Sequence, residues 1–202
     1  HFEGKPGKSK NETIARWSSK NLFFESPGKE TEIIIQVSNY HHHKGGIEHS
    51  IYLGGDEIIS ARSLRLSAIS IFLLGVLMIM ATYHLGMFIF KSNDKTNLFF
   101  ALAMIFTGIF SLTVSEILIE KIIPSLNWQV IVKTNYISNY LRLLFFLLFI
   151  YYSFRKQFNK TILYILIVAI VLMSLFSIIA LVVIITKTLN IFIVLAAISL
   201  IY

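Results

Sequence analysis

The sequence predicts a membrane protein in which the end of a β-sandwich precedes a bundle of transmembrane helices. Three observations predict this class: 55% of the residues are hydrophobic, only 14% are charged, and the mean hydropathy is +0.71. Soluble domains contain about a quarter charged residues, and long apolar stretches are typical of chains that cross a bilayer. The chain has no cysteine, which excludes disulfides, thiol catalysis and cysteine-based zinc sites.

Both ends of the sequence resemble cut ends. The first methionine is Met78, no signal-peptide pattern opens the chain, and Tyr202 falls inside an apolar run. We therefore expect a fragment of a longer protein, in which the absence of a motif carries little information.

Residues 1–62 are predicted to be the end of a sandwich rather than a whole domain. In 31–38 the side chains of Ile33, Ile35 and Val37 alternate onto one face of a strand, and glycine pairs flank a second short strand at 48–53. A third strand is expected within 11–24. So few strands cannot form a stable two-sheet core on their own.

Residues 67–202 are predicted to form the transmembrane bundle. A helix needs about 20 apolar residues to cross a bilayer, and inside lipid a helix satisfies the hydrogen bonds of its own backbone. The expected spans are 67–90, 97–119, 136–154 and 161–185, with a truncated fifth at 189–202.

The charges restrict the partners of the chain and leave its orientation open. Residues 1–65 carry a net charge of +1 and residues 66–202 carry +6, so the basic residues belong to the apolar half, where loops face lipid headgroups. This distribution does not favour nucleic-acid binding. Counted over both sides of the membrane, Lys and Arg are evenly divided. We expect the N-terminal segment outside the cytosol because short β-rich modules before a first span are commonly exported.

Three stretches carry a family resemblance. They are 39–46 (Asn-Tyr-His-His-His-Lys-Gly-Gly), the triplet Tyr83-His84-Leu85, and 97–102 (Asn-Leu-Phe-Phe-Ala-Leu). Together they resemble the bacterial seven-transmembrane receptors with diverse intracellular signalling modules (7TMR-DISM). The resemblance implies a jelly-roll type 2 extracellular domain similar to carbohydrate-binding modules, seven spans, and a cytosolic kinase, cyclase or phosphatase that this chain does not contain.

Candidate ligand-binding residues lie in the first of these stretches. They are Asn39, His41 and His43, with the alternative that they only shape the loop. Consecutive histidines point to different sides of an extended chain, so no metal site is predicted. Gly45 and Gly46 are predicted to supply a tight turn with positive φ.

Three ionisable residues fall within the expected spans. Such residues tend to face the bundle interior and to mark function. With the N-terminus outside, Glu116 and Arg142 would differ in depth by about 4–5 Å at 1.5 Å per residue, so we predict an ion pair, with separate snorkelling as the alternative. For His84 we expect a hydrogen bond to a neighbouring helix, with proton sensing as the less favoured reading.

The sequence contains no phosphate loop, metalloprotease or nucleophile-elbow motif, so no enzyme activity and no cofactor are expected for this segment. We predict a sensor of the bacterial inner (plasma) membrane that couples an extracellular small molecule, with a carbohydrate as one class, to a cytosolic output module. A homodimer is left open. The alternatives are a multi-pass transporter or permease subunit and a membrane-anchored scaffold.

Overall fold

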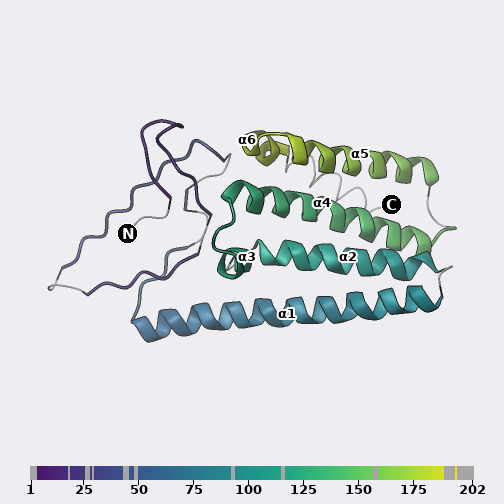
Figure 1. Cartoon of the computed structure of the whole chain (residues 1–202), viewed down its shortest axis with the longest axis horizontal. Coiled ribbons are helices and arrows are strands. Elements are labelled where there is room, and N and C mark those ends of the chain that lie inside the picture. The colour runs from purple at the N-terminus through teal and green to yellow at the C-terminus, as the bar shows by residue number, and fades with distance from the viewer. Residues whose placement is uncertain are drawn as a thin grey trace.

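A computed structural model describes residues 4–17, 19–25, 28, 30–42, 46–47, 50–91, 94–114, 117–156, 159–188 and 194. Within this part of the chain, four long helices lie side by side in the order in which they occur in the sequence (Figure 1). They are α1 (Asp56–Phe90), α2 (Lys95–Leu112), α4 (Trp128–Ser153) and α5 (Lys160–Ile179). Each is long and apolar enough to cross a membrane. The prediction of a membrane-type helical bundle is therefore confirmed.

The two ends of the bundle differ. One end, here called the junction end, holds the start of α1 and three short helices: α3 (Leu118–Ile122), α6 (Val182–Ile185) and η1 (Thr186–Thr188). The N-terminal segment also lies at this end (Figure 1). The opposite end, the short-loop end, holds the brief α1–α2 and α4–α5 connections.

Two of the helices begin earlier than the apolar pattern predicts. Helix α1 starts at Asp56 and α4 at Trp128, where Asn127 accepts a hydrogen bond from the backbone N–H of Gln129 at 2.9 Å. Since α1 has 35 residues, it is about 52 Å long at 1.5 Å per residue, against about 30 Å of bilayer hydrocarbon. Arg62 and Arg65 therefore lie within a continuous helix that extends beyond the membrane.

The helices α2 and α5 end earlier than predicted. The expected span 97–119 stops at Leu112, and the expected span 161–185 stops at Ile179. Near the end of α2, the hydroxyls of Ser111 and Thr113 donate to the carbonyls of Gly108 and Phe110 (2.7 Å each). Such side-chain bonds compete with the backbone ladder, which apolarity alone does not reveal. Of the expected fifth span, 189–202, only Val194 lies within the described residues.

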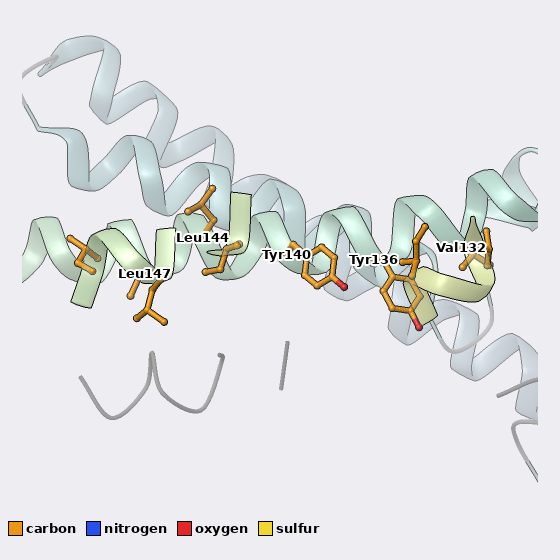
Figure 2. Packing of buried hydrophobic residues seen from close by; sticks show 10 residues of the cluster. Val132, Tyr136, Tyr140, Leu144 and Leu147 are labelled. Atoms are coloured by element: carbon orange, nitrogen blue, oxygen red, sulfur yellow. The ribbon is translucent and has the colours of Figure 1, made fainter. Parts of the chain in front are cut away.

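The core of the bundle lies between α4 and α5. Side chains from one face of α4 point towards α5 and α6 and are buried there (Figure 2). The labelled members are Val132, Tyr136, Tyr140, Leu144 and Leu147. Their spacing of three and four residues is that of one helix face.

An aromatic seam joins α2 to α4 on another face of α4. Phe99 and Phe106 stack on Phe145 with centroid separations of 6.4 and 5.4 Å, and Phe100 meets Phe149 at 5.0 Å. Aromatic pairs at these distances contribute about 0.5–1.5 kcal/mol beyond their burial in soluble proteins. The seam contributes to the packing of α2 against α4.

The N-terminal segment differs from its prediction. Its described residues form no strand, and their one β-bridge joins Lys5 to Ile14. Ile33, Ile35 and Val37 lie in extended chain with side chains about half exposed (54%, 51% and 53%). The alternation of apolar and polar residues therefore predicts an extended segment with two faces. A strand also needs backbone pairing with a neighbour, and no described residue forms a β-bridge with this segment.

Candidate functional site

The N-terminal segment is tied to the bundle by an ion pair. The Arg16 guanidinium donates from Nε and Nη2 to Oε1 of Glu120 in α3, at 2.9 and 2.7 Å. The Glu120 side chain is 11% exposed and that of Arg16 is 40% exposed. A charge-assisted contact of this kind is directional, and its partial burial shields it from salt.

Two aromatic contacts lie beside this ion pair. Trp17 packs against the core cluster between α4 and α5. The His41 ring meets the Trp128 ring edge-on with a centroid separation of 5.8 Å, and its Nε2 lies 3.3 Å from the Thr13 carbonyl. The N-terminal segment thus contacts α3, the first turn of α4 and the core. We call this set, Arg16, Trp17, His41, Glu120 and Trp128, the junction.

The candidate ligand residues of the N-terminal segment have structural contacts. The Asn39 side chain accepts a hydrogen bond from the His42 backbone N–H at 3.2 Å, which closes a local turn. Gly46 has a φ of +118°, a region that favours glycine. His43 and Gly45 lie outside the described residues. Among the described residues, no three side chains are grouped so that they could hold a metal ion.

Hydrogen bonds link the spans near the junction end. Asn135 Nδ2 donates to Oγ1 of Thr113 at 2.8 Å, joining α4 to the end of α2, and the hydroxyls of Tyr140 and Thr188 lie 3.0 Å apart. Asn139 is 6% exposed, and its Oδ1 has no hydrogen-bond partner among the described residues. Because lipid offers no competing partners, such bonds favour one arrangement of the helices.

The side chain of Arg142, a residue of α4, contacts α2. Its guanidinium carbon is 4.0 Å from the centroid of the Phe110 ring, a cation–π geometry. Glu116 lies outside the described residues. The predicted ion pair between them assumed a helix through residue 119, and α2 ends at Leu112. The depth argument for the pair therefore no longer applies, and the pair stays a prediction.

His84 contacts α2 at the short-loop end of the bundle. Its Nδ1 lies 2.7 Å from Oδ1 of Asn97, and its ring is 4.3 Å from that of Phe100. Both partners belong to the stretch 97–102. The structure thus brings together two of the three stretches that carry the family resemblance.

Sequence reasoning did not single out Arg16, Trp17, Glu120 or Trp128. The ion pair joins residues 104 positions apart, and each partner alone resembles an ordinary surface charge. One signal was available for Trp128, which lies just before the expected span 136–154. Tryptophan is enriched at membrane interfaces, which would have placed Trp128 near one boundary, whereas nothing in the sequence marked Trp17.

The bundle and junction define a class: a multi-pass helical membrane protein whose N-terminal segment is docked on one end of its spans. The chain belongs to the 7TM diverse intracellular signalling family, whose model matches residues 66–202, more than half of the sequence. Family membership makes it a membrane protein of the signalling-receptor class. No curated protein and no solved structure matches the chain.

Proposed function

We propose that this chain is the coupling part of a bacterial membrane receptor that detects an extracellular small molecule, with a carbohydrate as one class. The observation that carries the proposal is the junction, in which Arg16 and Trp17 of the N-terminal segment contact α3 and the helical core. A ligand that favours one position of the segment would thereby favour one packing of the spans. It can do so only through a difference in affinity for the two arrangements.

Two routes connect the N-terminal segment to the spans. The first is the backbone, which continues from the N-terminal segment into α1 at Asp56 without interruption. A cation–π contact supports this route, since the Arg62 guanidinium lies 3.8 Å from the centroid of the Tyr52 ring. The second is the junction, which reaches α3 and α4 directly. A displacement of the segment would move α1 relative to α4, because the two routes end on different helices.

The output and the orientation are part of the proposal. We propose that the N-terminal segment lies outside the inner membrane and that a kinase, cyclase or phosphatase follows the spans in the cytosol. The short-loop end carries five basic residues and one acidic residue. The basic residues are Lys91, Lys95, Arg155, Lys156 and Lys160. Because Lys and Arg are evenly divided between the two ends, the proposed orientation is supported by the export that is common for short modules before a first span, and not by charge.

A change at the junction should be detectable at the other end of the bundle. Because the chain lacks cysteine, spin labels can be placed at Phe90→Cys and Phe154→Cys, two side chains that are 92% and 55% exposed at the short-loop end. A receptor predicts that Arg16→Glu shifts the distance distribution between these labels. The matched control is Lys10→Glu, the same charge change at an exposed site. If Arg16→Glu and Lys10→Glu both leave the distribution unchanged, the chain is a passive scaffold.

A further inference from the structure

A chain of three polar side chains joins α1 to α2 at the short-loop end. His84 Nδ1 lies 2.7 Å from Asn97 Oδ1, and Asn97 Nδ2 donates to Asp94 Oδ2 at 3.0 Å. The other oxygen of Asp94 accepts from the backbone N–H of Thr96 at 3.2 Å and caps α2. Asp94 is thus held in place by the helix that it caps.

The hydrogen-bond pattern defines where the protons are. A carboxylate only accepts hydrogen bonds, so the NH₂ group of the Asn97 side chain must face Asp94. The carbonyl oxygen of the same side chain must then face His84. Since that oxygen also only accepts, His84 carries a proton on Nδ1. Its Nε2 is then the one ring atom that can gain a proton, and imidazole is the side chain whose charge changes near neutral pH.

One carboxylate and two aromatic rings lie near His84. The carboxylate of Asp94 is one side chain away, the centroid of the Phe100 ring lies 4.3 Å from that of the imidazole, and the Tyr83 ring meets the imidazole edge-on at 5.2 Å. The other charged or titratable groups at this end of α1, α2 and α4 include Lys91, Lys95 and Tyr152. The Lys95 ammonium lies 5.9 Å from the Tyr152 ring centroid, over α4.

We propose that His84, Asn97 and Asp94 form a proton-binding site. When His84 binds a proton, the contact between α1 and α2 is stabilised, so the packing of the spans depends on pH as well as on ligand. Uptake of a proton at Nε2 strengthens the bond to Asn97 and the contact with Phe100. Phe100 in turn lies 5.0 Å from Phe149, which carries the change to α4. This proposal does not depend on the binding of an extracellular ligand.

The test measures the distance between spin labels at Phe90→Cys and Phe154→Cys in reconstituted protein from about pH 8 to about pH 5. We expect a shorter mean and a narrower distribution as the pH falls. His84→Gln keeps a side-chain N–H for Asn97 and cannot gain a charge, so the response should disappear. With the other five histidines intact, this variant separates the site from them.

A second variant keeps the proposal testable if His84→Gln does not fold. Asp94→Asn retains a capping oxygen and removes the negative charge that orients the Asn97 side chain, so the pH-dependent change in distance should become smaller. Imidazole ¹⁵N spectra of wild type and His84→Gln identify the titrating ring directly. A wild-type distribution that does not change with pH, or a response that persists in His84→Gln, would overturn the proposal and leave the junction unaffected.

Discussion

Arg16 and Glu120, 104 residues apart in sequence, form a two-donor ion pair that holds the N-terminal segment against α3. Trp17, the neighbour of Arg16, packs against the helical core, so the ion pair lies at the edge of an apolar contact. The covalent connection of the segment to the bundle is elsewhere, through α1. The segment is therefore attached at two separate places, and displacement of one attachment relative to the other can change helix packing.

Charge reversal tests this ion pair. Arg16→Glu or Glu120→Arg alone should release the segment, with about 0.5–1 kcal/mol lost, or about a two- to fivefold larger undocked fraction, as for partly exposed pairs. The double reversal should restore docking of the segment. Docking can be measured by acrylamide quenching of the fluorescence of Trp17 and Trp128, because both tryptophans of the chain lie at the junction. Quenching in the double variant as strong as in the singles would show that the two side chains do not act as a pair.

The bond from Asn135 to Thr113 should stabilise the packing of α2 against α4. Thr113→Val keeps the shape of the side chain and removes its oxygen, so we expect a loss of about 0.6 kcal/mol, and at most about 2 kcal/mol, in the free energy of unfolding. Thr107→Val is the matched control, since the Thr107 hydroxyl donates to Ala103 of its own helix. Reversible unfolding in mixed micelles measures both. Equal losses would mean that the bond between the helices contributes nothing measurable.

The helices α1 and α2 approach closely at Gly108. A Cβ atom there would lie 3.2 Å from Leu74 Cδ1 and 3.7 Å from Met78 Sδ, whereas one at Gly75 would meet no atom within 4 Å. Gly108→Leu should therefore destabilise the bundle by about 1–3 kcal/mol, and Gly75→Leu should have little effect. The same unfolding measurement applies. A similar response to both substitutions would contradict this packing of α1 on α2.

The sequence predicts an ion pair between Glu116 and Arg142, and the structure adds a competing partner for the arginine in Phe110. If the ion pair forms, exchanging the two charges (Glu116→Arg with Arg142→Glu) should recover stability that each single variant loses. If Arg142 is held by the Phe110 ring alone, the exchange should be no better than Arg142→Glu. Unfolding of the four proteins of this cycle decides between the two contacts.

The existence of the spans could be predicted because their apolar residues are continuous and lipid requires a helical backbone. The ends of the spans could not be predicted as well. Whether α2 stops at Leu112 depends on hydroxyls that bond to carbonyls a turn away, and these occur on residues that a hydropathy average treats as neutral.

The candidate site was predicted less completely than the fold. His84 was expected to bond to a neighbouring helix, but its partner Asn97 and the link to Asp94 depend on how the α1–α2 turn brings them together. His41 was singled out for its imidazole, whereas the structure uses its ring against Trp128. In the extended segment around Ile35, the alternation of apolar and polar residues correctly predicts two faces. It does not predict which residues pack on those faces, and the apolar side chains are about half exposed.

The central claim is that a segment outside the cytosol is docked on the outer end of membrane-spanning helices. Because the chain has no cysteine, single exposed sites can be labelled in intact cells with a membrane-impermeant maleimide: Asn11→Cys in the N-terminal segment and Lys156→Cys at the short-loop end. The account predicts that Asn11→Cys reacts at once and that Lys156→Cys reacts only after the membrane is permeabilised. Labelling of Lys156→Cys in intact cells, with Asn11→Cys protected, would contradict it.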